Sequence, residues 1–157
     1  MIKNIIEFFR VIGELRFIIP LLKYKWPEPN DSASLAHTFQ ESVDKYGDQN
    51  FIYFEDQIWT YYQINEAANI LSNKLISDGL VHGDRVVLFM ENRPEYVITL
   101  LALNKIGVIG VLINTSLTGA PLIHCINSSD SKKCFVGAEL MNSLEEVLDD
   151  INVKDSS

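Results

Sequence analysis

Residues 85–119 read RVVLFMENRPEYVITLLALNKIGVIGVLINTSLTG, and this stretch decides the fold. Val86–Phe89 is a short apolar run without polar alternation, which is typical of a strand that is buried on both faces. Pro94 is tolerated in the first turn of a helix, and the apolar residues after it continue until Gly107, a residue that often ends a helix. Val108–Ile113 is a second uninterrupted apolar run. The stretch therefore predicts a strand, a buried helix and a second, parallel strand.

Three elements are predicted upstream of this unit. The first is a helix that ends at Gly47 and has one apolar face, made of Ala36, Phe39, Val43 and Tyr46. The second is a β-hairpin of residues 51–54 and 58–61, with its turn at Asp56 and Gln57. The third is a helix that begins with a capping box of Thr60 and Gln63 and ends at Gly79. Its expected buried stripe is Ile64, Ala67, Ala68, Leu71 and Leu75.

Downstream, Thr118 is the expected N-cap of a short helix that contains Leu122, Ile123 and Ile126. Cys134–Val136 is the expected third strand. A last helix is predicted from the spacing of Leu140, Leu144, Val147, Leu148 and Ile151. Strands that alternate with helices in this way favour an α/β fold with a doubly wound, mostly parallel sheet.

The first 26 residues differ in character from the rest of the chain. Their apolar residues recur at helical spacing, which predicts an amphipathic helix, and they carry five Lys or Arg against two Glu, a balance of +3 within the total of −8. Such a helix could lie on a membrane surface or dock on the protein's own core. Residues 27–33 contain two prolines and predict a linker, so we expect three segments: 1–26, 27–33 and 34–157.

Composition limits the class of protein. A chain of 157 residues, 47% hydrophobic, is long enough for one domain with a real core. The net charge of −8 disfavours general nucleic-acid binding, which normally uses a basic face. Cys125 and Cys134 are too few for a disulfide framework and are expected to be reduced, mostly buried thiols. Charges interrupt the N-terminal apolar segment before it reaches the length of a membrane span, so we expect a cytoplasmic protein.

No glycine loop for phosphate binding is present. Gly107 and Gly110 lie inside an apolar run without the Rossmann or P-loop spacing, which favours close packing. Asn114–Gly119 is rich in hydroxyl groups and follows a strand, where open α/β sheets bind ligands. No lysine follows and only one glycine is present, which favours a simple loop with an N-cap.

The titratable residues do not form a catalytic pattern either. His37, His82 and His124 fall in three different elements without partners at metal-ligand spacing. His124 and Cys125 are adjacent on a predicted helix, so their side chains diverge, and Asp149 and Asp150 read as a solvated acidic end. The residues alone thus predict no catalytic, cofactor-binding or metal-binding site.

Four segments carry a resemblance to a known family. WTYYQINEAANILSNKL (59–75) and LALNKIGVIGVLINTSL (101–117) resemble the first two core motifs of the adenylate-forming, or AMP-binding, enzymes, and the resemblance covers about residues 34–150. MENRPEY (90–96) and INTSLTGAPLIHC (113–125) are most similar to the branch of fatty-acid transport proteins and very-long-chain acyl-CoA synthetases. Ser116 and Thr118 depart from that branch, which usually has asparagine and arginine there.

The resemblance implies the first part of an ATP-dependent ligase that joins a long-chain fatty acid to coenzyme A through an acyl-adenylate, with Mg²⁺. The family's adenylation loop, its acidic and aromatic motifs and its catalytic lysine would all follow residue 157, so the resemblance assigns no catalytic residue here and implies a fragment that is inactive alone and binds none of these cofactors. Its expected partners are the missing C-terminal portion and, through residues 1–26, the inner face of a membrane. Two other hypotheses remain open: a non-catalytic module that binds another chain, and a peripheral lipid-binding protein.

Overall fold

The structure is a computed structural model that describes residues 34–153. The predicted amphipathic helix of residues 1–26, the linker of residues 27–33 and the tail of residues 154–157 lie outside the described residues. Within the described part, no helix combines the length and the apolar character that crossing a bilayer requires.

The centre of the fold is a three-stranded parallel sheet, as predicted. Its strands are β3 (Arg85–Phe89), β4 (Ile109–Leu112) and β5 (Lys133–Val136), in the spatial order β4-β3-β5. Val87 of the central strand pairs with Val111 of β4 and with Cys134 of β5. The side chains of β3 from Val86 to Phe89 are fully buried, because helices cover both faces of this strand.

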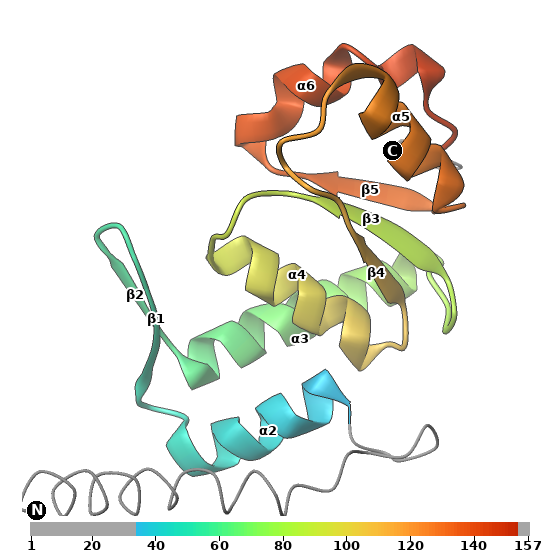
Figure 1. The fold of residues 1–157 in the computed structure, drawn as a ribbon. Helices are drawn as coiled ribbons and strands as arrows, with labels where there is room; N and C mark the ends of the chain where they lie inside the picture. The colour runs from blue at the N-terminus through green and yellow to red at the C-terminus, as the bar shows by residue number, and fades with distance from the viewer. Residues whose placement is uncertain (1–33, 154–157) are drawn as a thin grey trace, which may run out of the picture. The chain divides into compact units, whose positions relative to one another are not determined.

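Two hydrophobic cores lie on opposite faces of this sheet. Val86 packs with α3 (Tyr61–Ser77) and α4 (Pro94–Lys105), whereas Val87 and Phe89 pack with α5 (Gly119–Ser128) and α6 (Met141–Glu145). Figure 1 shows the two pairs of helices on either side of the sheet. This arrangement confirms the doubly wound α/β fold, because successive side chains of a strand point to opposite faces.

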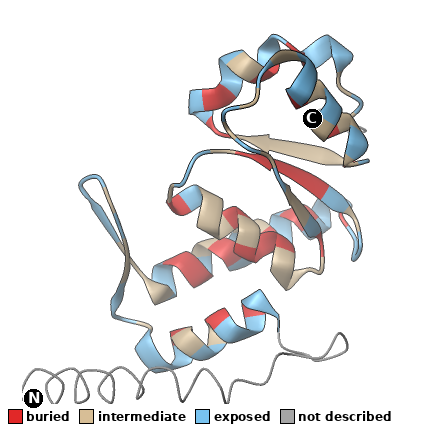
Figure 2. Ribbon diagram, viewed as in Figure 1, coloured by how far each residue is buried: buried red, intermediate tan, exposed pale blue. Residues whose placement is uncertain are grey.

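Helix α4 is buried on several sides. Pro94 occupies its first turn without loss of a helical hydrogen bond, and Leu101, Ala102 and Leu103 are buried at three consecutive positions. Three consecutive residues point in three directions around a helix, so α4 contacts neighbours on most of its circumference. Figure 2 shows the resulting concentration of buried residues in α4 and β3.

Helices α3 and α2 (Leu35–Tyr46) complete this side of the fold. The predicted capping box is present, since Gln63 N–H donates to Thr60 Oγ1 over 3.2 Å and Thr60 N–H donates to Gln63 Oε1 over 2.9 Å. At the other end of α3, Leu80 N–H donates to the Leu75 carbonyl over 3.1 Å, around Gly79 with a φ of 85°. This is the Schellman C-cap that the sequence predicts.

The predicted β-hairpin is present, but its turn lies one residue earlier in the sequence than predicted. Strands β1 (Asn50–Phe54) and β2 (Gln57–Thr60) pair Phe54 with Gln57, so the turn consists of Glu55 and Asp56 rather than Asp56 and Gln57. Glu55 adopts a φ of 50° without being glycine. The usual Gly that marks such a turn is missing from the sequence, which explains the error.

The prediction of one continuous last helix is wrong. The segment is divided into η1 (Ala138–Leu140), α6 and η2 (Leu148–Asp150), with a break at Val147, where φ is −120° and ψ is 4°. Leu148, placed on the buried face by its spacing, is 50% exposed. A continuous helix would end in Asp149 and Asp150, and carboxylates at a helix C-terminus oppose the helix dipole.

Candidate functional site

The loops that follow the three strands gather at one edge of the sheet, because all three strands are parallel. In open α/β sheets this carboxyl edge is the usual place for a ligand. A hollow of about 380 Å³ lies between the loops after β3 and β4. The residues that line it are Met90, Glu91, Asn92, Tyr96, Ile113, Asn114 and Thr115. The hydroxyl-rich loop singled out in the sequence thus contributes its first two residues to this hollow.

That loop is held by its own asparagine. Asn114 Oδ1 accepts a hydrogen bond from Ser116 N–H over 2.9 Å, and the Asn114 carbonyl accepts one from Leu117 N–H over 3.1 Å. Thr118 occupies the N-cap position of α5, as predicted, but its side chain makes no capping hydrogen bond. The loop is therefore a turn in which the side-chain oxygen of Asn114 is already used internally.

An ion pair between Arg93 and Glu139 connects the loop after β3 with the loop after β5. The Glu139 carboxylate accepts a hydrogen bond from Glu91 N–H and another from Arg93 Nη1, each over 2.9 Å. Arg93 Nε also donates to Glu95 over 2.8 Å. The hydrogen bond from the Glu91 backbone, together with the Arg93 charge, lowers the pKa of Glu139 from its ordinary value. No sequence pattern predicts this pair, because Arg93 and Glu139 are 46 residues apart in the chain.

The two glycines of residues 101–117 serve packing, as predicted. Gly107 has a φ of 69°, and a Cβ atom there would overlap the ring of His82. A Cβ atom on Gly110 would lie 3.3 Å from Leu100 Cδ1. The contact at Gly107 also accounts for the position of His82. The His82 ring packs against the backbone between α4 and β4, where only glycine leaves room for it.

The other candidate residues remain apart. His37 is on α2, with its Nε2 atom 3.7 Å from the Glu41 carboxylate, and His124 is on α5. Cys125 and Cys134 are free thiols, half-buried rather than fully buried, and burial raises the pKa of the Cys134 thiol to about 11. Within residues 34–153, no three His, Cys, Asp or Glu side chains converge on a point where a metal ion could bind.

The chemistry available at the carboxyl edge is that of a binding surface. It offers amide, hydroxyl and carboxylate groups in an open hollow. Of the residues named above at this edge, only Arg93 is cationic, and it forms ion pairs with the carboxylates of Glu95 and Glu139. The described residues do not fit a magnesium–nucleotide site, since they lack both a converging set of acidic ligands and a glycine loop. We therefore derive no catalytic step through them.

The family model of the "AMP-binding enzyme" matches residues 39–156, which include the whole sheet and both cores. The chain belongs to the AMP-binding enzyme family. This match agrees with the resemblance carried by residues 59–75 and 101–117.

The chain is similar in sequence to two curated relatives. "Long-chain fatty acid transport protein 6" of Mus musculus is 28% identical over 143 residues, which are 90% of this chain and 23% of that protein. "Medium/long-chain-fatty-acid–CoA ligase FadD6" of Mycobacterium tuberculosis is 33% identical over 118 residues, which are 75% of this chain and 20% of that protein. The chain thus spans about a quarter or less of the length of these relatives.

Solved structures share the fold. An anthranilate CoA ligase, AuaEII, in complex with anthranoyl-AMP has a TM-score of 0.73 at 20% identity, covering 78% of this chain and 24% of that one. The N-terminal domain of FACL13 from Mycobacterium tuberculosis, bound to an inhibitor, has a TM-score of 0.68 at 26% identity, covering 73% of this chain and 29% of that one. The fold is therefore that of part of the N-terminal subdomain of acyl-CoA ligases and related adenylating enzymes.

Proposed function

We propose that the chain is the N-terminal part of an ATP-dependent long-chain fatty acid–CoA ligase. The observation that carries this proposal is the match of residues 39–156 to the AMP-binding family, together with relatives that are named fatty-acid transport proteins and a fatty-acid–CoA ligase. The role of this part is structural: it supplies one parallel sheet and its flanking helices to a larger domain.

The reaction proposed for the whole enzyme has two steps. The fatty-acid carboxylate attacks the α-phosphorus of ATP, which forms the acyl-adenylate and releases pyrophosphate. The thiolate of coenzyme A then attacks the acyl carbonyl and releases AMP. Adenylation is needed because a carboxylate would otherwise have to expel oxide, whereas AMP is a good leaving group. Magnesium offsets phosphate charge in such reactions, and its ligands would come from outside the described residues.

We propose that the isolated chain does not catalyse either step. The test is a fatty-acid-dependent exchange of pyrophosphate into ATP by the purified chain, for which we expect no signal above a heat-denatured sample. Exchange that depends on both the chain and a long-chain fatty acid would contradict this proposal.

Reading the nucleotide sequence beyond the codon for Ser157, in all three forward frames, tests the assignment itself. We expect a Ser/Thr/Gly-rich loop that ends in Pro-Lys, followed by the other adenylation motifs. Unrelated sequence in all three frames would favour the non-catalytic module instead.

Membrane contact is the second part of the proposal. Residues 1–26 combine apolar residues at helical spacing with a local charge of +3, and an acyl chain partitions into a bilayer by about 0.8 kcal/mol per buried CH₂. We propose that this segment, joined by residues 27–33 to the domain of residues 34–157, rests on the inner face of the membrane while the domain works in the cytoplasm. Flotation with anionic liposomes should be abolished by deletion of residues 1–26, and unchanged flotation would refute the role of this segment.

A further inference from the structure

A short series of hydrogen bonds between side chains runs from the surface of α2 into its contact with α3. On α2, Gln40 Nε2 donates to Asp44 Oδ1 over 2.9 Å, and Asn65 Nδ2 of α3 donates to Gln40 Oε1 over 3.1 Å. Asn65 is buried at 7% exposure, and its Oδ1 atom accepts no hydrogen bond in the part of the chain that the structure describes. The series therefore ends in an unpaired buried oxygen.

Turning the two amide groups does not remove this unpaired atom. If Asn65 alone is turned, its Oδ1 faces Gln40 Oε1, which is also an acceptor, and its Nδ2 becomes the unpaired atom. If Gln40 is turned as well, its Oε1 faces the Asp44 carboxylate, which is again an acceptor. The Asp44 carboxylate thus fixes the orientation of both amides, and the contact of α2 with α3 contains one unsatisfied polar atom.

This oxygen opposes the packing of α2 on α3. A buried acceptor without a donor has given up its hydrogen bonds to water and has gained none in return. If α2 leaves α3, the hydrogen bond between Asn65 and Gln40 is exchanged for hydrogen bonds to water, and Asn65 Oδ1 gains a partner. The unsatisfied atom therefore lowers the free energy needed to open this contact.

Three buried apolar residues hold α2 in place. They are Ala36, Phe39 and Val43, each with 8% or 9% of its surface exposed. Helices α3 and α4 contact each other far more extensively than either contacts α2, which lies on their side away from the sheet (Figure 1). The contact between α3 and α4 therefore does not require α2.

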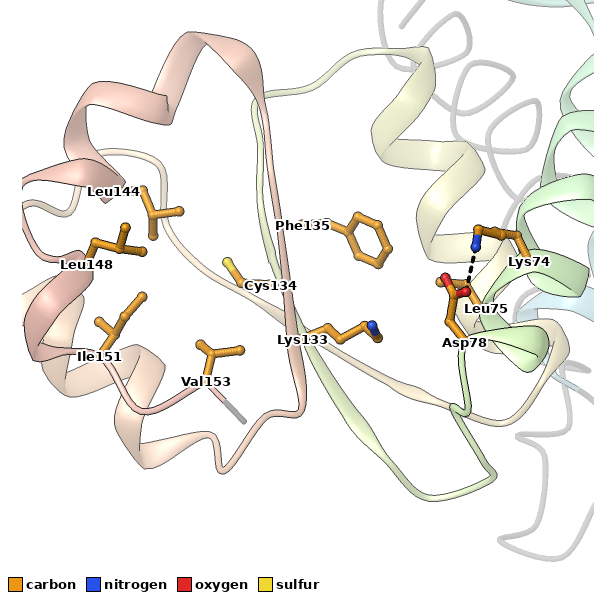
Figure 3. A pocket seen from close by; sticks show the side chains of 10 residues that line it. All are labelled: Lys74, Leu75, Asp78, Lys133, Cys134, Phe135, Leu144, Leu148, Ile151 and Val153. Atoms are coloured by element: carbon orange, nitrogen blue, oxygen red, sulfur yellow. Dashed lines mark hydrogen bonds and ion pairs between the residues drawn. The ribbon is translucent and has the colours of Figure 1, made fainter. Parts of the chain in front are cut away.

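Helices α3 and α4 are also anchored to the sheet. Figure 3 shows Phe135 of β5 pointing toward Leu75 of α3, beside an apolar groove of about 600 Å³ that both residues line. Val86 of β3 packs in the same core as Leu75, and α4 supplies Leu101 and Leu103 to it. Opening of α2 would thus uncover part of this core without detaching α3 or α4 from the sheet.

We propose that α2 is a strap, residues 35–46, that opens as a unit while the sheet, α3 and α4 stay folded, and that the unpaired oxygen of Asn65 promotes this opening. The closed strap is the major state, because it buries Phe39 and Val43. Since α2 begins at Leu35, its opening also loosens the connection between residues 1–33 and the sheet. This proposal concerns helix packing and does not depend on ligase activity.

Native-state hydrogen exchange of the full chain, measured at low urea concentrations, tests the opening. After correction for intrinsic rates, we expect the amides of Phe39 and Val43 to exchange at least about tenfold faster than the amide of Val87 in β3. Their exchange should depend only weakly on urea, because local opening exposes little surface, whereas the exchange of Val87 should depend on urea strongly.

A substitution on α3 tests the cause of the opening. Asn65→Leu replaces the unpaired amide by an apolar group of similar size, and Gln40, which is half-buried, can then bond to water. We expect this variant to slow the exchange of Phe39 and Val43 by at least about fivefold. Asn69→Leu, at an exposed position one turn further along α3, is the matched control and should leave their exchange unchanged.

Either of two outcomes would overturn the proposal. If Phe39 and Val43 exchange at the rate and with the urea dependence of Val87, α2 opens only when the whole domain unfolds. If Asn65→Leu leaves their exchange unchanged, accelerates it or abolishes the cooperative melt, the unpaired oxygen does not promote the opening.

Discussion

Leu101 is the residue whose burial the fold depends on most clearly. It lies on α4 at 2% exposure, within the core that α2, α3 and α4 share with Val86. Replacing it by Asp would leave an unpaired charge in this core, at a cost of more than about 4 kcal/mol, which is a large part of the stability of a typical domain. We expect Leu101→Asp to abolish the cooperative thermal transition measured by circular dichroism.

The control for this substitution is Ile70→Asp, since Ile70 is 67% exposed on α3 and its replacement introduces the same charge at the surface. A Leu101→Asp protein that melts cooperatively near the temperature of the parent would show that the assignment of the core is wrong.

Gly107 combines two constraints that substitution can separate. Its φ of 69° costs an alanine about 1 kcal/mol, and the new Cβ would also overlap the His82 ring. Gly79 has a similar φ of 85° with no heavy atom within 4 Å, so Gly79→Ala measures the backbone cost alone. We expect urea denaturation to give a loss of more than about 2 kcal/mol for Gly107→Ala, and about half of that for Gly79→Ala.

A second variant isolates the contact with the histidine. Relative to His82→Ala, the double variant Gly107→Ala/His82→Ala should lose only the backbone cost, because the ring is absent. If the loss from Gly107→Ala is the same with and without His82, the overlap plays no part.

The hydrogen bonds of Glu139 should make stability depend on pH. Its pKa is lowered in the folded state, so its contribution is fully present well above the ordinary value of 4.5 and is lost as the pH falls through the depressed folded value. We expect the difference in urea midpoint between the parent and Glu139→Gln to shrink as the pH is lowered from about 6 to below 4.5. Glu145→Gln, at an exposed position of α6, is the control. A pH-independent difference would refute this role of the carboxylate.

At the scale of elements, the capping box offers the sharpest prediction. Thr60 and Gln63 each satisfy a backbone N–H at the start of α3, a helix that supplies Ile64, Ala68 and Leu75 to the core. Thr60→Ala should destabilise the protein by about 1 kcal/mol in urea denaturation. Thr60→Ser keeps the hydroxyl acceptor and should cost much less, and equal losses for the two variants would mean that the hydrogen bond is not the cause.

The elements that sequence predicted well are those whose signals are local. The buried strand at Val86–Phe89, the start of α4 at Pro94 and the end of α3 at Gly79 each depend on residues within one or two turns of the chain. The last helix was mispredicted because the spacing of apolar residues does not register the break at Val147, beyond which Asp149 and Asp150 would oppose the dipole of a continuous helix.

The location of the loops at the carboxyl edge could be predicted from the sequence, but the contacts between their side chains could not. A doubly wound sheet fixes where the loops meet, and Asn114 could be assigned to that edge from its position after a strand. The pairing of Arg93 with Glu139 could not be predicted, because it joins loops that only the folded sheet brings together. The buried Asn65, whose amide donates to Gln40 Oε1 over 3.1 Å, was missed for the same reason.

At the scale of the whole molecule, the chain is a sheet with an apolar groove at one edge and a hollow at its carboxyl end, without a described catalytic group. Its relatives are about four or more times longer than the part that it matches. These proportions support the proposal that the chain is the first part of a ligase whose catalytic groups lie in the remainder.

The central claim can be tested most directly with a chimera. Residues 39–156 replace the matching part of the FadD6 ligase from Mycobacterium tuberculosis, with which this chain is 33% identical, and fatty-acid-dependent release of AMP in the presence of coenzyme A is measured. The controls are FadD6 without that part, and the chimera carrying Leu101→Asp. We expect ligation by the chimera and none by either control. A chimera that folds, as judged by a cooperative melt, but releases no AMP would contradict the claim that this chain is the N-terminal part of a fatty acid–CoA ligase.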